Sequence, residues 1–143
     1  MKTIKFTSLW KQLVLVGSML LLVISFTSCS HKTAFNTSTI IPAARGEVKV
    51  KKDNNNNYKI ELELSYLAEP ERLQPPKKTY VVWLVGEDRN APINIGRIEG
   101  NKKLKVKFET VSSTKPKRIF ISAEDDYATQ FPSYTIVLET NDL

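Results

Sequence analysis

From residue 47 onward, apolar and polar residues alternate with a period of two, which is typical of β-strands with one buried face. The alternation is clearest in the run 58–66, where Tyr, Ile and Leu residues alternate with Lys, Glu and Ser. The run 79–85 is apolar on both faces, so we expect it in the centre of the domain. Seven short strands are predicted, at residues 48–50, 58–66, 79–85, 93–98, 104–108, 118–122 and 134–139.

Residues that favour turns separate these strands. The run 53–57 is one Asp followed by four Asn, which predicts a turn between the first two strands. The segment 69–78 contains three Pro and is predicted to be a loop, and Gly100-Asn101 predicts a tight turn. With no convincing amphipathic helix in this region, we expect an all-β domain over residues 46–143. The strand number favours an immunoglobulin-like β-sandwich with Trp83 as an aromatic plug between its sheets.

The first 28 residues have the three regions of a secretory signal peptide. Residues 1–11 carry three Lys and no acid, the run 12–24 is uncharged and mostly apolar, and residues 25–28 are mainly Ser and Thr. A helix needs about 20 apolar residues to cross a bilayer, and the run 12–24 is shorter. We therefore expect a cleaved signal peptide at 1–28, with an uncleaved membrane anchor as the alternative.

The signal ends in Phe26-Thr27-Ser28-Cys29, and Cys29 is the only cysteine of the chain. This segment resembles a bacterial lipobox, with Phe26 in place of the usual Leu, and its Ser and Thr residues are similar to those of Bacteroidetes-type lipoproteins. The resemblance implies cleavage before Cys29 and attachment of lipid to its sulfur. Several acyl chains would anchor the protein stably. A buried free thiol is the alternative, although Cys29 lies among polar residues.

Residues 29–45 begin as a polar segment without periodicity, which predicts a flexible tether between the lipidated Cys29 and the domain. No acidic cluster follows Cys29. In Bacteroidetes-type lipoproteins such a cluster often marks export to the cell surface. We therefore expect an anchor in the outer membrane of a Gram-negative bacterium that faces the periplasm, with the cell surface as the alternative.

Three segments of the domain carry a second resemblance. The chain reads Tyr-Val-Val-Trp-Leu-Val at 80–85 and Ile-Gly-Arg-Ile at 95–98, and Ile-Ser-Ala-Glu at 121–124 precedes Pro132-Ser133. These segments resemble the Tyr-x-Val-Trp-Leu, Leu-Gly-x-Leu/Phe and Val-Thr-x-Glu…Pro-Thr elements of the extracytoplasmic C-terminal domain of anti-sigma-K factors (the RskA-like family). The resemblance covers under half of the chain and implies fold more than function. Residues 1–11 are too few to form a sigma-binding domain, so a regulatory sensor is only a distant alternative.

Charge and histidine content exclude several functions. The net charge is +6, but Lys2, Lys5 and Lys11 contribute half of it and lie in the predicted signal peptide. The remaining balance is too small to predict nucleic-acid binding, which needs a concentrated basic face. His31 is the only histidine. Catalytic Ser-His-Asp and Cys-His arrangements and multi-histidine metal sites are therefore excluded, and we expect no enzyme activity, cofactor or metal.

Two charged clusters are candidate sites. Glu124-Asp125-Asp126 is the densest acidic group, and it is either a solvated turn or an oxygen-rich cation site without the spacing of a known calcium loop. The second cluster consists of Lys102, Lys103, Lys105 and Lys107. These lysines either protect an edge strand from aggregation or form a basic stripe for anionic lipid or polysaccharide.

The sequence is most consistent with a membrane-anchored envelope lipoprotein that binds another protein as an adaptor or accessory subunit. The main alternative is a carbohydrate- or peptidoglycan-binding module, for which Tyr127, Phe131 and Tyr134 could form an aromatic rim. We expect core packing for Phe131 and Tyr134. A hydrolase is a more distant alternative, because it would need paired carboxylates in a cleft.

Overall fold

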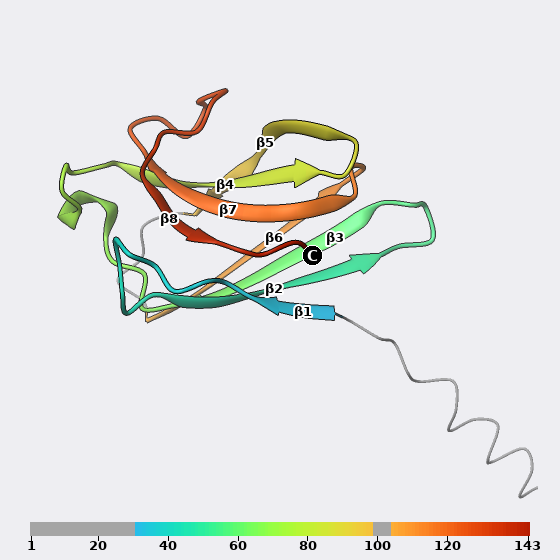
Figure 1. Ribbon diagram of the computed structural model, residues 1–143, viewed down its shortest axis with the longest axis horizontal. Helices are drawn as coiled ribbons and strands as arrows, with labels where there is room; N and C mark the ends of the chain where they lie inside the picture. Colours follow the sequence, from blue (N-terminus) through green and yellow to red (C-terminus); the bar gives the residue numbers. More distant parts are fainter. Residues whose placement is uncertain (1–30, 99–103) are drawn as a thin grey trace, which may run out of the picture.

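The computed structural model of the protein describes residues 31–98 and 104–143, which form two antiparallel four-stranded sheets (Figure 1). The first sheet has the strand order β1-β2-β3-β6 and the second the order β5-β4-β7-β8. The strands are β1 (His31–Ala34), β2 (Arg45–Lys52), β3 (Tyr58–Ser65), β4 (Thr79–Gly86), β5 (Arg89–Ile98), β6 (Lys105–Ser112), β7 (Pro116–Glu124) and β8 (Ile136–Glu139). A 3-10 turn, η1 (Pro70–Arg72), lies in the predicted loop.

The prediction of an all-β sandwich is confirmed. The seven predicted strands correspond to β2 to β8, with shifted ends. The orders β2-β3-β6 and β4-β7-β8 match the A-B-E and C-F-G orders of immunoglobulin-like sandwiches, and β5 adds to the second sheet beside β4. Because β5 and β6 lie in different sheets, they do not form a hairpin. The turn predicted at Gly100-Asn101 lies outside the described residues.

The alternating pattern places one apolar face of each sheet in the core. In the first sheet Val48 pairs with Leu62, and Val50 pairs with Ile60. Both pairs face the second sheet, while the intervening Lys and Glu residues face outward. The predicted turn at 53–57 is confirmed, because the Asp53 carboxylate accepts hydrogen bonds from the backbone N–H groups of Asn55 and Asn57, both at 2.8 Å. The largest buried core side chains are Tyr80, Ile60, Leu62, Leu64, Leu84, Ile119 and Ile121.

Trp83 lies on a different face from the one expected. Alternation along β4 directs Tyr80, Val82 and Leu84 into the core between the sheets, so Trp83 lies on the outer face of the second sheet. There it forms a separate buried cluster with Val81, Val85 and Phe120. The aromatic residue of β4 that lies between the sheets is Tyr80, whose hydroxyl donates to the Ala68 carbonyl at 2.9 Å. Burial raises the pKa of Tyr80, so this hydroxyl stays protonated.

The prediction of a flexible tether at residues 29–45 needs correction for residues 31–45, which the structure describes as part of the sandwich. Residues 31–34 form β1, which pairs along β2, and the following Phe35, Ile41 and Ala44 are buried. Gly46 permits this packing, because a Cβ atom there would lie 3.0 Å from the Phe35 ring. The chain then reaches the second sheet, where the Asn36 N–H donates to the Glu139 carbonyl at 2.8 Å. In the described part of the chain the sandwich therefore already includes His31, and the edge strand β1 was missed because it is short and mostly polar.

Candidate functional site

The loop between β7 and β8, residues 125–135, carries most of the large exposed aromatic side chains of the described residues. Phe131 is 80% exposed, Tyr134 is fully exposed and Tyr127 is 55% exposed. Ile136, at the start of β8, is also exposed. The expectation of core packing for Phe131 and Tyr134 is therefore wrong. Because β8 begins only at Ile136, neither residue takes part in the alternation of a strand. We call Tyr127, Phe131, Tyr134 and Ile136 the aromatic surface.

Hydrogen bonds hold this loop against β5. The Asn94 side chain donates from Nδ2 to the carbonyls of Tyr127 and Thr129, at 2.9 and 3.1 Å. Within the loop, the Asp126 carboxylate accepts from the Ala128 N–H at 2.9 Å, and the Thr129 hydroxyl donates to the Phe131 carbonyl at 2.8 Å. The loop backbone is thus fixed on both sides of Ala128, and its exposed side chains project from a defined frame.

Arg97 on β5 fixes the first aromatic ring of the loop. Its guanidinium carbon lies 4.5 Å from the centroid of the Tyr127 ring, which is within the range of a cation–π contact. The contact leaves the guanidinium over one face of the ring. That face is therefore not available as a flat platform for a ligand, although the remainder of Tyr127 is exposed.

A buried chain of hydrogen bonds joins the end of the loop to Trp83. The Trp83 Nε1–H donates to the Ser122 hydroxyl at 2.8 Å, and this hydroxyl donates to the Glu124 carboxylate in a short hydrogen bond. The same carboxylate accepts from the Ser133 N–H at 2.7 Å, and the Ser133 hydroxyl donates to the Ala123 carbonyl at 3.0 Å. Glu124 is only 5% exposed. Its carboxylate therefore connects strand β7, Trp83 and the loop.

The three acidic residues predicted as a candidate cation site do not converge. Glu124 is buried in the chain of hydrogen bonds to Trp83. Asp125 forms an ion pair with Lys77 at 2.7 Å, and Asp126 caps the loop through the Ala128 N–H. The described residues contain no group of three His, Cys, Asp or Glu side chains placed to hold a metal ion. Each carboxylate has a structural partner, which explains the acidic run without a ligand.

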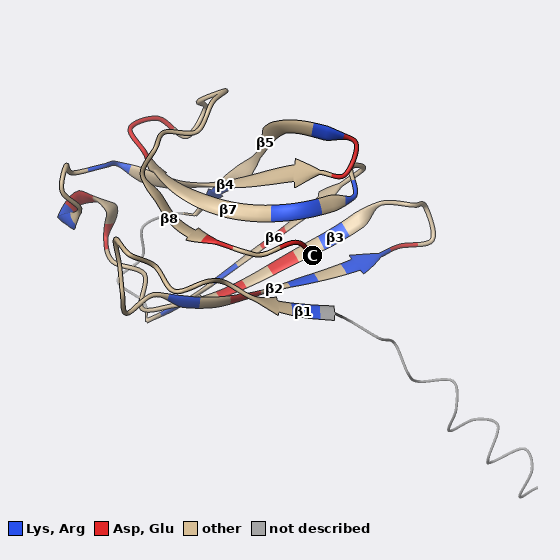
Figure 2. Ribbon diagram, in the orientation of Figure 1, with Lys and Arg blue, Asp and Glu red and all other residues tan. Residues whose placement is uncertain are grey.

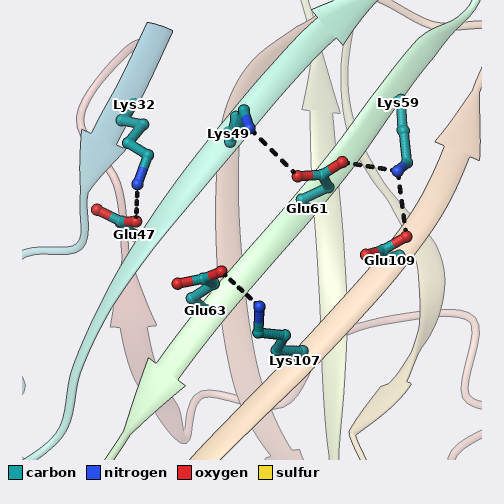
Figure 3. Close-up of polar contacts among 8 residues, drawn as sticks. All are labelled: Lys32, Glu47, Lys49, Lys59, Glu61, Glu63, Lys107 and Glu109. Carbon is teal, nitrogen blue, oxygen red and sulfur yellow. Dashed lines mark hydrogen bonds and ion pairs between the residues drawn. The ribbon is translucent and has the colours of Figure 1, made fainter. Parts of the chain in front are cut away.

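Lys105 and Lys107, the described lysines of the second charged candidate, lie on β6 in the first sheet, where basic and acidic residues are interspersed along the strands (Figure 2). Lys107 pairs with Glu63 at 2.9 Å, and Lys105 has no ion pair among the described residues. Lys102 and Lys103 lie outside the described residues. Figure 3 shows the surrounding pairs: Lys32 with Glu47, Lys49 with Glu61, and Lys59 with both Glu61 and Glu109. The described part of this face is therefore a ladder of alternating charges rather than a basic stripe.

The ladder makes stability depend on pH at both extremes. The hydrogen bond from Lys59 lowers the pKa of Glu61 below its usual 4.5, and the bond from Lys107 does the same for Glu63. The partner interactions raise the pKa of both lysines above 10.5. A lowered carboxyl pKa contributes stability that is present above pH 4.5 and is lost as the pH falls through the folded-state pKa. A raised lysine pKa contributes stability that is present below pH 10.5 and is lost in stronger base.

We expect the thermal midpoint of the protein to fall by a few degrees in acid because these exposed pairs are lost. The measurement is thermal unfolding by circular dichroism from neutral pH to about pH 3. The Glu61→Gln variant should show a weaker dependence on pH than the wild type. The control is Glu71→Gln, which removes an exposed carboxylate outside the ladder and should keep the wild-type dependence. Equal pH profiles for wild type and Glu61→Gln would contradict the assigned role.

A groove of about 620 Å³ opens between the sheets at the end of the sandwich opposite to the aromatic surface. Strand β7 runs from one end of the sandwich to the other, because it begins with Pro116 at the groove and ends with Glu124, where the β7–β8 loop starts. The groove is lined by Thr33, Val50, Lys52, Tyr58, Lys115, Pro116 and Leu143. Two lysines flank its apolar walls, and the described residues that line it include no acidic side chain.

Several residues that shape the aromatic surface were missed by the sequence analysis. Asn94 and Arg97 lie in a strand whose register shifts at a bulge, so alternation does not show that they contact a distant loop. Nothing in the sequence around Ser122 and Ser133 marks them as hydrogen-bonding partners. The one available indication is that a buried Trp83 needs an acceptor for its indole N–H. The spacing between Tyr80 and Trp83 could have shown that they lie on opposite faces of the sheet, because residues three apart along a strand point to opposite faces.

The segments 80–85, 95–98 and 121–124, for which the sequence analysis proposed a resemblance to anti-sigma-K factors, lie on the adjacent strands β4, β5 and β7 of the second sheet, and Pro132-Ser133 lies in the β7–β8 loop. Cys29 and the predicted signal peptide at 1–28 lie outside the described residues. In the described part of the chain, no helix has the length and apolar character needed to cross a membrane. Comparisons with protein-family models, with curated proteins and with solved structures gave no match to this chain.

Proposed function

We propose that the protein is a non-enzymatic lipoprotein of the bacterial envelope, anchored through Cys29 in the outer membrane and facing the periplasm. Its β-sandwich acts as an adaptor or accessory subunit that binds another envelope protein. The lipobox-like segment before Cys29 supports the anchor. The aromatic surface on the β7–β8 loop supports the binding function and is the surface at which we propose that the partner binds.

The observation that carries the proposal is a set of exposed aromatic side chains on a fixed loop. Exposed single apolar residues are common, but Phe131 and Tyr134 lie on one short loop together with Tyr127. The hydrogen bonds from Asn94 and to Glu124 order the loop backbone before any partner arrives. A preformed loop loses little conformational entropy on binding, and aromatic side chains supply much of the binding energy in protein interfaces.

A protein partner fits this surface better than a carbohydrate. Phe131 and Ile136 have no polar side-chain atoms to pair with sugar hydroxyls, and Arg97 covers one face of the Tyr127 ring. A sugar site needs polar side chains beside its aromatic rings to fix the ligand, and Phe131 and Ile136 supply none. A protein partner can instead bury Phe131 in an apolar pocket and leave Arg97 at the polar rim.

The test compares the double variant Phe131→Ala/Tyr134→Ala with the wild type in isolation of the partner from detergent-solubilised envelopes. Truncation of one interface hot spot typically costs about 2 kcal/mol, or roughly thirtyfold in affinity, so we expect nearly complete loss of the partner. Both side chains are exposed, and the variant should therefore keep the wild-type thermal midpoint.

The matched control is Val111→Ala, which truncates an exposed apolar residue on β6, outside the aromatic surface. It should retain the partner at the wild-type level. Retention of the same partner by the double variant would contradict the assignment of the aromatic surface. Recovery of envelope polysaccharide in place of a protein, lost in the double variant, would establish the carbohydrate-binding alternative.

A further inference from the structure

The folded domain begins very close to the predicted lipid attachment site. Only Ser30 separates Cys29 from His31, the first residue of β1. Two residues of extended chain span at most about 7 Å. Residues 31–45, which were expected to hold the domain away from the membrane, are instead part of the sandwich. A lipid on Cys29 therefore leaves almost no free chain between the bilayer and the domain.

The topology shows which parts of the sandwich lie beside His31. This residue pairs with Val50, two residues before the end of β2, and the β2–β3 turn at 53–57 follows directly. Thr33 of β1 lines the groove together with Pro116 at the start of β7. Figure 1 shows the start of β1, the β2–β3 turn and the C-terminus toward the same end, while the β7–β8 loop lies toward the other. We call the first of these ends the anchor end.

Side chains at the anchor end suit an interface with lipid. The groove walls include the apolar side chains of Val50, Pro116 and Leu143. The Lys52 ammonium lies 5.9 Å from the centroid of the Tyr58 ring at the same groove. Tyr and Lys are residue types found at membrane–water interfaces, where an apolar body and a polar tip meet two solvents.

The charges of the anchor end are nearly balanced, so they neither attract nor exclude the bilayer strongly. The Asp53 carboxylate is engaged by turn amides, and Lys115 forms an ion pair with Glu87 at 2.6 Å. Lys51 and Lys52 are exposed, and Asp88 and Asp142 provide opposite charge. The position of the domain is therefore set by the short chain before His31 rather than by electrostatic attraction.

We propose that the anchor end rests directly on the lipid bilayer and that the aromatic surface points away from it. The proposal rests on lipid attachment at Cys29, which belongs to the proposed function. Strand β7 has nine residues, and the eight steps between Pro116 at the groove and Glu124 span roughly 26 Å at about 3.3 Å per step. The β7–β8 loop is thus displayed at the far side of the domain, where a second protein reaches it without displacing lipid.

The test uses two single-thiol variants of the full-length lipidated protein. Because Cys29 is the only cysteine and its sulfur carries the lipid, an added cysteine is the only free thiol. Asn55→Cys places a fluorophore on the β2–β3 turn, and Gln130→Cys places it on the β7–β8 loop; both residues are exposed. The proteins are reconstituted into phosphatidylcholine vesicles that contain a lipid with a nitroxide quencher on its headgroup. We expect loss of most of the fluorescence at position 55 and little loss at position 130.

A second variant tests the cause of the contact. An insertion of about ten Gly and Ser residues between Ser30 and His31 adds a flexible reach of roughly 17 Å and should abolish the difference between the two labels. High salt should leave the wild-type difference unchanged, because charge does not set the position. Equal quenching of the two labels in the wild type, or a difference that survives the insertion, would overturn the proposal.

Membrane attachment is measured in the same samples. This measurement tests lipid attachment at Cys29 separately from the orientation of the domain. If Cys29→Ser stays in the membrane fraction as the wild type does, lipid attachment at Cys29 is refuted and the proposed orientation fails with it. If Cys29→Ser is released but the labels of the lipidated protein are quenched equally, the anchor stands and only the orientation is refuted.

Discussion

Replacement of Trp83 by alanine is expected to lower the free energy of unfolding by about 3–5 kcal/mol, a large fraction of the stability of a small domain. The indole is fully buried and lies parallel to the Phe120 ring, with 6.2 Å between the ring centroids. Its removal leaves a cavity on the outer face of the second sheet. It also removes the donor to Ser122, at one end of the hydrogen bonds that hold the loop.

Chemical denaturation followed by circular dichroism measures this loss. The matched variant Trp83→Phe keeps an aromatic ring but removes the Nε1–H donor, so it should lose clearly less stability than Trp83→Ala. Because Glu124 joins Ser122 to Ser133, both variants should also loosen the β7–β8 loop and increase its cleavage by proteases. A loss below about 1 kcal/mol in Trp83→Ala would contradict a sealed cluster on this face.

Replacement of Cys29 by serine is expected to move almost all of the protein from the membrane fraction to the soluble periplasmic fraction. Serine cannot supply the thiol that receives the lipid, and the multiple acyl chains of a lipoprotein give an anchor that one chain alone does not. Fractionation and immunoblotting of a tagged protein measure the distribution. Ser30→Ala, which changes the next residue and keeps the thiol, should remain in the membrane fraction. Retention of Cys29→Ser would contradict the lipoprotein assignment.

The period-two pattern was sufficient to predict strands such as β2, β3 and β6, because each of them buries one face and exposes the other. In β3, Ile60, Leu62 and Leu64 face the core, and a shift by one residue would expose all three. The turn at Asp53 was also predictable, since the Asp carboxylate pairs with nearby backbone amides. These features depend on local chemistry and on a single repeated requirement, the burial of alternate residues.

Features that depend on contacts distant in sequence could not be predicted in the same way. β1 is a four-residue edge strand with a polar sequence, and it is defined by pairing with β2 and by the burial of Phe35. The run 79–85 is apolar on both faces, so its pattern does not distinguish the core face from the outer face. Trp83 was therefore placed between the sheets. Its position on the outer face depends on partners about forty residues later in the sequence, such as Ser122, which accepts its indole hydrogen bond.

The candidate site was predicted only in part. The aromatic residues Tyr127, Phe131 and Tyr134 were recognised, but the exposure of the last two follows from the late start of β8. The acidic run was recognised as a cluster, although Glu124 turns inward to Ser122 while Asp125 turns to Lys77. Neighbours in sequence thus acquired separate structural roles, because each has a different partner in the folded chain.

Site-specific photo-crosslinking in living cells tests the central claim most directly, namely that the protein binds another envelope protein through the aromatic surface. A photoreactive residue at position 131 lies on the aromatic surface, and the same residue at position 111 lies on β6. Our account predicts that position 131 captures one or two envelope proteins in amounts comparable to the bait, and that position 111 does not. Capture of the same proteins at both positions, or of none at position 131, would contradict it.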